Sequence, residues 1–341
     1  MDFNIFNMRL KYIDCLKGIA IFMVVIGHVL ANNYNNPGDD SPYSFLLFNF
    51  VYAFHTKLFM FMSGYVMDLN RNKIWNTSLV ALTIKKRFVS LLIPTITFTI
   101  IAYAANRGFA VPWFLRCLFE ITLFFCLLSL IGNYFKLAFK YQLIIYILGY
   151  IFILFIDRTT KGSMFHNIMG MTYFHMWYPY FILGYVFHRY IIYYYMKKYD
   201  IYAIALVCFA ILYYNYYFTE QSKLVEVVTR YALAISGIII IYFFVRVSNS
   251  NRFLFNVFTY LGKYSLHIYL LSDYFIPNFA QVENTIVYAA LNNDFAKSTT
   301  IFWQLIWGIA LSTYAVSMSL LIVKVVEKSR LLNLICFGKR N

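Results

Sequence analysis

Apolar segments of similar length recur along the whole chain, and they constrain its fold more than any other feature. The hydrocarbon core of a bilayer is about 30 Å thick, and a helix needs about 20 apolar residues to cross it. Only helices and closed barrels satisfy their backbone hydrogen bonds in lipid, and these segments are too long and too uniform for barrel strands. We therefore predict an all-α integral membrane protein, with a single membrane domain over residues 1–341.

About ten segments have the length of a transmembrane helix. Lys and Arg concentrate in alternate connecting segments, as expected if those segments lie in the cytoplasm. The pattern predicts a bundle of about ten transmembrane helices with both termini cytoplasmic. The predicted spans are Ile13–Ala31, Phe45–Met67, Phe88–Ala105, Trp113–Ile131, Tyr141–Ile156, Thr172–Phe187, Ile201–Phe218, Val227–Val245, Tyr264–Phe279 and Thr300–Val323.

The composition excludes a soluble protein. Hydrophobic residues make up 62% of the chain and charged residues only 13%, whereas soluble domains are roughly 45–50% apolar and 25% charged. A net charge of +15 would suggest nucleic acid as the partner of a soluble protein. Here the positive charge orients the helices and faces anionic lipid, so we expect membrane lipids as partners and no nucleic acid. We expect a multi-pass protein of a cell membrane, specifically the bacterial cytoplasmic membrane.

The first predicted span contains three ionisable residues, Asp14, Lys17 and His28. Such groups are costly inside a membrane, so each is a candidate functional residue. Lys17 and His28 are eleven positions apart, which places them on the same helix face with about 16 Å between them along the axis. Asp14 precedes Lys17 by one helical turn and can pair with it. Two simpler interpretations stay open, an interfacial Asp14–Lys17 pair that reaches water and a hydrogen-bonded core histidine at position 28.

The second predicted span contains His55 and Lys57 near its middle. Lys57 lies too deep to reach the interface easily, so it must face protein, water or an anion. Ser63 and Gly64 follow, and small residues of this kind favour close helix packing over chemistry.

The remaining polar residues of the spans have mainly structural interpretations. Arg116 and Glu120 have the spacing of an ion pair on one helix face. His175 and His267 are single histidines for which core packing is the better interpretation, and Asp273 is expected near the outer edge of its helix. The chain has no HExxH motif, no glycine-rich phosphate loop and no GxSxG motif. We therefore expect no metal site.

Several motifs resemble those of the acyltransferase-3 family of multi-pass membrane O-acyltransferases, whose first helix carries an Asp, then Arg or Lys, ten residues and a His. The second helix of the family is rich in aromatic residues and ends in Ser-Gly, and weaker similarities follow along most of the chain. The matching motifs here are Tyr12-Ile13-Asp14-Cys15-Leu16-Lys17-Gly18-Ile19-Ala20 with Gly27-His28, Phe54-His55 with Ser63-Gly64-Tyr65, Lys85-Lys86-Arg87 with Pro94, Trp113-Phe114-Leu115, Pro179-Tyr180-Phe181 with Gly184-Tyr185, and Leu261-Gly262 with Ser265-Leu266 and Ile268-Tyr269-Leu270.

The resemblance implies transfer of an acyl group, usually acetyl from acetyl-CoA, to a hydroxyl of a cell-surface glycan or a lipid-linked sugar. His28 would be the catalytic residue, and Lys17 with Asp14 would lie at the CoA phosphates. Substrate-binding or supporting roles are expected for His55, Lys57, Ser63, Arg116 and Glu120.

The chain departs from the family pattern at three positions. Lys57 and Arg116 stand where the family usually has Pro, and Ser272 stands where a His is common. These departures leave the acyl group and the acceptor open.

A transporter or flippase for a polysaccharide precursor is the main alternative function. It predicts inverted repeats or Gly/Pro-broken helices in matching halves of the chain, and the sequence indicates neither. A small-ligand sensor or a structural membrane protein would not need a polar stripe that joins the two faces of the membrane. The sequence therefore favours an enzyme.

Overall fold

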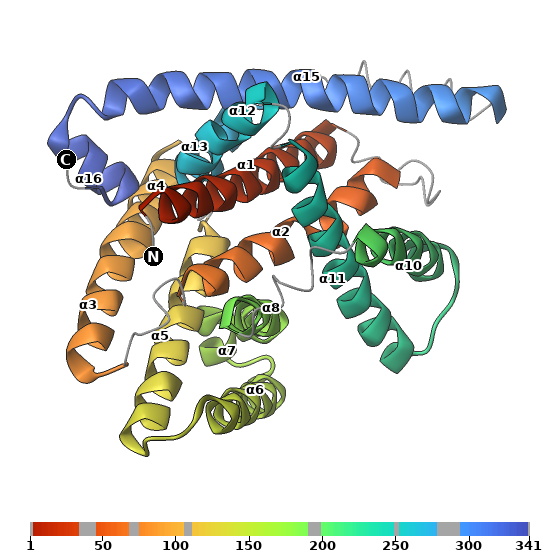
Figure 1. Cartoon of the computed structure of the whole chain (residues 1–341). Helices are drawn as coiled ribbons and strands as arrows, with labels where there is room; N and C mark the ends of the chain where they lie inside the picture. Colours follow the sequence, from red (N-terminus) through yellow and green to blue (C-terminus); the bar gives the residue numbers. More distant parts are fainter. Residues whose placement is uncertain are drawn as a thin grey trace. The chain divides into compact units, whose positions relative to one another are not determined.

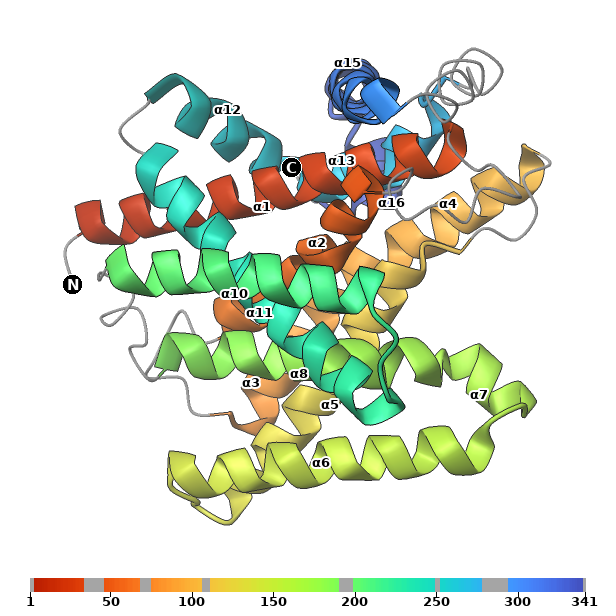
Figure 2. The same ribbon diagram turned by 90° about the vertical axis from the view of Figure 1, so that its right-hand side faces the viewer.

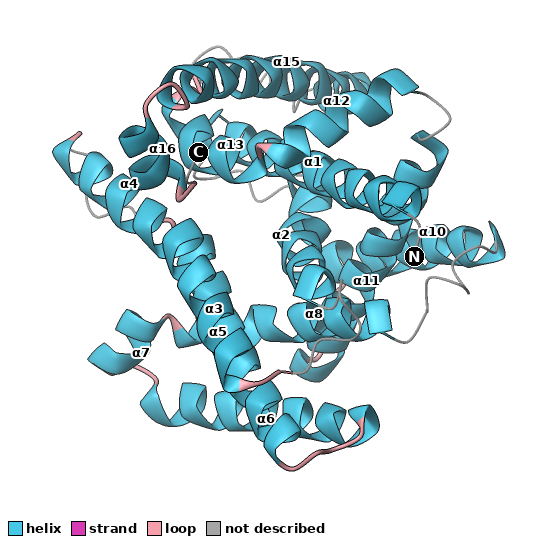
Figure 3. Cartoon of the chain, turned by 60° about the vertical axis from the view of Figure 1, so that its left-hand side comes forward, coloured by secondary structure: helices cyan, strands magenta, loops and turns pink. Residues whose placement is uncertain are grey.

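The computed structural model describes residues 3–33, 46–67, 75–105, 111–189, 199–248, 252–277 and 294–339. All regular elements in these ranges are helices, which confirms the all-α prediction for this part of the chain (Figure 3). They are α1 Phe3–Asn33, α2 Leu46–Met67, α3 Thr77–Arg87, the π-helical turn η1 Phe88–Leu92, α4 Ile93–Ala104, α5 Trp113–Tyr134, α6 Phe139–Thr160, α7 Met164–Met169, α8 Met171–Arg189, α10 Tyr199–Phe218, α11 Lys223–Ser248, α12 Arg252–Lys263, α13 Ser265–Leu271, the 3-10 turn η2 Ser272–Tyr274, α15 Asp294–Val326 and α16 Arg330–Phe337.

Seven helical stretches of the described ranges are long and apolar enough to cross a membrane. Each overlaps a predicted span, so the chain has the helices of a multi-pass membrane protein. The total of about ten spans and the cytoplasmic position of both termini stay predictions. The seven stretches are Lys11–Ala31, Thr77–Ala104, Trp113–Tyr134, Phe139–Thr160, Asp200–Phe218, Lys223–Val245 and Leu305–Val326.

The predicted ninth span, Tyr264–Phe279, is wrong as a continuous helix. The chain leaves helical geometry at Tyr264, where α12 ends and α13 begins, and α13 gives way to η2 after Leu271. Pro277 follows η2, and a proline disfavours helical geometry in the residue before it. In the described part of the chain, the apolar run of this segment therefore covers a short helix and a 3-10 turn, an interruption that mean hydropathy does not detect.

The helix of the predicted third span begins earlier than Phe88. Asn76 caps α3 by accepting a hydrogen bond from the backbone N–H of Leu79, and the chain stays helical from Thr77 to Ala104. The π-helical turn η1 lies in the middle of this stretch, directly after the basic residues Lys85, Lys86 and Arg87.

The described residues group into two compact units, each made of separate parts of the chain. The first contains Met1–Phe59 and Tyr195–Val323, and the second contains Met60–Tyr194 and Lys324–Asn341. The prediction of a single domain over the whole chain stays a prediction.

In the first unit α1 lies along α12 (Figure 1). Two glycines allow this contact, because a Cβ atom on Gly18 would collide with the carbonyl group of Phe258 and one on Gly262 would collide with that of Asp14. The backbones of the two helices therefore touch at the level of Asp14 and Lys17. Further along α1, Val25 and Val29 are fully buried in an apolar cluster with Ile268 of α13.

In the second unit α6 and α8 lie side by side and α7 connects them at one end (Figure 2). The core is aromatic, since the buried ring of Phe125 stacks on Tyr146 and contacts Tyr185 edge-on. A second reciprocal glycine contact joins the part of α2 in this unit to α8, because Cβ atoms on Gly64 and Gly184 would both collide with backbone of the opposite helix.

Candidate active site

His28 lies near the end of α1, and its imidazole Nδ1 is 2.6 Å from Oδ1 of Asp273. The packing of α13 on α1 brings the two residues together although they are far apart in sequence. Asp273 is the middle residue of η2, a turn that is anchored by the fully buried Ser272. The His28 side chain is 26% exposed and the Asp273 side chain 52%, so the pair is accessible in the described part of the chain.

This contact determines which imidazole nitrogen of His28 can act as a base. An ionised carboxylate only accepts hydrogen bonds, so the proton of a neutral His28 imidazole lies on Nδ1 and is donated to Asp273. The lone pair is then on Nε2, where it can accept a proton from a substrate. Asp273 also stabilises the imidazolium that forms when Nε2 takes that proton. The arrangement is that of a general base with an orienting carboxylate.

Comparison with known protein families shows which family the chain belongs to. A family model described as an acyltransferase domain, that of the acyltransferase-3 family, matches residues 10–322. The chain belongs to this acyltransferase family. It is a membrane acyltransferase, and the matched range contains both His28 and Asp273. Searches of curated proteins and of solved structures found no match.

Asp273 is the residue of the acyltransferase that sequence reasoning missed. The sequence predicts it near the outer edge of a membrane helix, and the structure places it in η2, directly after α13; its pairing with His28 is not predicted. A signal was present in the sequence: Asp273 is an isolated carboxylate at the end of an apolar segment, and an intramembrane histidine requires a partner.

At the other end of the predicted stripe, Asp14 and Lys17 are half-buried on α1. The Asp14 carboxylate interacts electrostatically with Lys17, as expected, and also with Lys263 at the end of α12. Since α1 is one unbroken helix, the spacing of Lys17 and His28 corresponds to about 16 Å along its axis. The helix therefore meets the geometric condition for a cation and a base on one face.

His55 and Lys57 of α2 both bond to backbone within their own helix. His55 is buried, and its Nδ1 donates a hydrogen bond of 2.7 Å to the carbonyl oxygen of Val51. The lone pair of a neutral His55 imidazole is therefore on Nε2. The Lys57 ammonium donates a bond of 2.6 Å to the carbonyl oxygen of Tyr52, so part of its hydrogen-bonding capacity is satisfied by protein. Both residues belong to the unit that contains His28.

The other predicted supporting residues, Ser63, Arg116 and Glu120, lie in the second unit. Ser63 is half-buried beside the close contact of Gly64 with α8. The predicted Arg116–Glu120 ion pair is present, with Nε 3.5 Å from Oε1. The second carboxylate oxygen of Glu120 is buried and has no hydrogen-bond partner among the residues that the structure describes. The guanidinium lies against Gly170, where α7 meets α8, and leaves no room for a side chain there.

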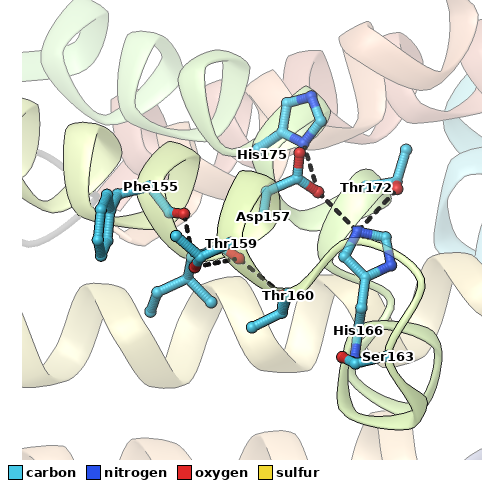
Figure 4. A network of polar contacts seen from close by, with 9 residues as sticks. Phe155, Asp157, Thr159, Thr160, Ser163, His166, Thr172 and His175 are labelled. Carbon is cyan, nitrogen blue, oxygen red and sulfur yellow. Dashed lines mark hydrogen bonds and ion pairs between the residues drawn. The ribbon is translucent and has the colours of Figure 1, made fainter.

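A further polar cluster lies in the second unit, where α6, α7 and α8 meet (Figure 4). Oδ1 of Asp157 is 2.9 Å from Nε2 of His166 and 3.4 Å from Nδ1 of His175. The half-buried ring of His175 therefore faces a carboxylate, which the core-packing interpretation does not include. His267, by contrast, is buried, and its ring centroid lies 5.4 Å from that of Tyr264, as the core-packing interpretation predicts.

This cluster does not form a nucleophilic triad. The hydroxyl of Thr172 is 3.4 Å from Nε2 of His166, the nitrogen that also faces Asp157. A triad needs the hydroxyl and the carboxylate on opposite nitrogens of the imidazole. Within the described ranges, no group of three or more His, Cys, Asp and Glu residues is placed to hold a metal ion. The cluster links three helices of its unit, and the His28–Asp273 pair is the better candidate for acid–base chemistry.

Proposed function

We propose that this membrane acyltransferase moves an acetyl group from acetyl-CoA to a hydroxyl of a cell-surface glycan or a lipid-linked sugar. The observation that carries the proposal is the contact between His28 and Asp273, which orients a general base next to solvent-accessible space. The resemblance of the α1 and α2 motifs to those of sugar O-acetyltransferases supports the choice of donor and acceptor.

In the proposed reaction, Nε2 of His28 takes the proton of the acceptor hydroxyl while that oxygen attacks the thioester carbonyl carbon. A C–O bond forms, and the carbonyl oxygen becomes an oxyanion. The C–S bond then breaks, and the imidazolium returns its proton to the sulfur of the departing CoA. Asp273 keeps the imidazole in the reactive tautomer and stabilises its positive charge during this sequence.

We place the acetyl-CoA nucleotide at the Lys17 end of α1. An ammonium acts as a compact point charge and suits the spread negative charge of phosphates. Asp14 positions Lys17, and the pantetheine arm would follow α1 so that the thioester arrives near His28. His55, Lys57, Ser63, Arg116 and Glu120 are proposed to support the site or the acceptor, and no step requires a metal.

Mass spectrometry of surface glycans tests this proposal. Ester groups are compared among cells that carry the intact protein, a His28→Ala variant, or no protein, at equal protein levels. His175→Ala is the matched control, because His175 is also half-buried and also faces an aspartate. We expect esters to be lost in the His28→Ala cells and retained in the His175→Ala cells. Esters at normal levels in the His28→Ala cells would exclude the proposed role of His28, and unchanged glycans without the protein would point to another acceptor class.

A further inference from the structure

Tyr52 of α2 packs directly against the residue that precedes His28. A Cβ atom on Gly27 would come within 2.9 Å of Cε2 of the Tyr52 ring, a distance that real side chains do not tolerate. Glycine at position 27 therefore leaves room for the Tyr52 ring against the α1 backbone. The ring also packs against an apolar cluster that contains Ile26 and Leu30 of α1. Tyr52 is thus held beside His28 by both helices.

The orientation of Tyr52 is further restricted by its neighbours on α2. The ring of Phe48 stacks on it with a centroid distance of 4.0 Å, and the ring of His55 contacts it edge-on at 4.7 Å. The ammonium of Lys57 binds the Tyr52 carbonyl oxygen at 2.6 Å. Phe48 and His55 thus contact the Tyr52 ring, and Lys57 binds the Tyr52 backbone; the hydroxyl takes no part in these three contacts. The charge of Asp273, which contacts His28, acts on the Tyr52 phenol.

The proposed reaction needs a hydrogen-bond donor for the oxyanion that forms on the thioester carbonyl. His28 cannot supply it at the moment of attack, because its Nδ1–H is donated to Asp273 and its Nε2 accepts the hydroxyl proton. A neutral His55 has the same limit, since its only N–H is donated to the Val51 carbonyl. Asp273 is an acceptor. The half-buried Tyr52 carries an O–H group on a ring with a fixed position.

We propose that the Tyr52 hydroxyl donates a hydrogen bond to the thioester carbonyl oxygen as it becomes the oxyanion. This inference rests on the proposed function and adds a residue to it. The proton of the acceptor hydroxyl passes to Nε2 of His28 and then to the CoA sulfur, while Tyr52 keeps its own proton throughout. Tyr52 therefore stabilises the transition state without taking part in proton transfer.

The test is the Tyr52→Phe variant, which removes one oxygen and keeps the ring that packs on Gly27. Initial rates of radiolabelled acetyl transfer from acetyl-CoA to glycan acceptor are measured in membrane vesicles. Removing one oxyanion donor typically lowers kcat about 100- to 1000-fold. We expect a loss of this size with KM for acetyl-CoA changed less than about twofold, and with the shape of the pH–rate profile retained because His28 is intact.

Tyr217→Phe is the matched control. Tyr217 lies on α10, and its hydroxyl donates a hydrogen bond of 3.1 Å to the carbonyl oxygen of Asn49 on α2. This variant therefore removes a tyrosine hydroxyl that contacts the same helix on which Tyr52 lies. We expect it to keep its kcat. Melting temperatures of both variants in detergent separate a loss of chemistry from a loss of folding.

The outcomes distinguish this inference from the proposed function. If Tyr52→Phe keeps kcat within about twofold of the parent while His28→Ala is inactive, the Tyr52 role is wrong and the proposed function stands. A rise in KM with unchanged kcat would also overturn it, because the hydroxyl would then bind the ground state. If His28→Ala transfers acetyl at the normal rate, the proposed function itself fails.

Discussion

Replacing Asp273 with asparagine should slow acyl transfer while leaving the fold in place. The two side chains have nearly the same shape, so the 2.6 Å contact with Nδ1 of His28 can persist. The amide oxygen accepts the same N–H, but the negative charge that stabilises the imidazolium is gone. The variant therefore removes the charge of Asp273 and also weakens the tautomer preference, because an amide can donate to Nδ1 as well as accept from it.

The size of the effect follows from the geometry. A hydrogen bond to a charged group contributes about 1.5–3 kcal/mol. An increase of about 1.36 kcal/mol in the activation free energy slows a reaction about tenfold. The Asp273 side chain is 52% exposed, so solvent screens part of its charge and the lower half of the range applies. We expect kcat to fall about 10- to 50-fold.

The assay is radiolabelled acetyl transfer in membrane vesicles, with KM for acetyl-CoA and melting temperature measured in parallel. Asp200→Asn is the control, because Asp200 is an exposed carboxylate of the same unit in the first turn of α10. It should behave like the parent protein. A kcat for Asp273→Asn within about twofold of the parent, with normal expression, would refute the role given to this carboxylate.

Three further changes test other parts of the account. Gly18→Ala should lower the melting temperature and destabilise the first unit by about 1–3 kcal/mol, because its Cβ collides with the Phe258 carbonyl; an unchanged melting temperature would contradict the packing. Asp157→Asn should weaken the α6–α7–α8 corner by about 1–3 kcal/mol without changing kcat, since it removes the carboxylate shared by His166 and a second histidine. Lys17→Gln should raise KM for acetyl-CoA and leave kcat nearly unchanged; a loss confined to kcat would exclude phosphate binding there.

The part of the fold that follows from local sequence was predictable. Helix α1 contains the whole predicted span Ile13–Ala31, because the length and the apolar character of this segment are local properties of the sequence. The ion pair of Arg116 and Glu120 was predictable for the same reason, since residues four apart on a helix are neighbours.

The break between α12 and α13 at Tyr264 was not predictable from hydropathy, which measures the composition of a segment and not its continuity. The close contact of Gly262 with the Asp14 carbonyl occurs directly before this break. Contacts of this kind depend on a helix that is distant in sequence, so no window along the chain detects them. The same limit applies to Thr77–Ala104, where a π-helical turn interrupts an otherwise regular helix.

The candidate site shows this limit most clearly. His28 was identified from its spacing to Lys17 and from a family motif, which are both local signals. Its partner Asp273 lies 245 residues away and is brought to it by the packing of α13 on α1. The pairing of Asp157 with His175 escaped prediction in the same way, because it joins the end of α6 to α8. Local pattern thus located the base, and tertiary packing supplied its orienting carboxylate.

Acetyl transfer by purified protein in liposomes tests the central claim most directly. Radiolabelled acetyl-CoA and glycan acceptor are supplied to the parent protein and to His28→Ala, with His175→Ala as the control and equal amounts of folded protein confirmed by size exclusion. Our account predicts that label reaches the glycan with the parent and the control and stays at background with His28→Ala. Transfer by His28→Ala at the rate of the parent would contradict the assignment of this imidazole as the general base.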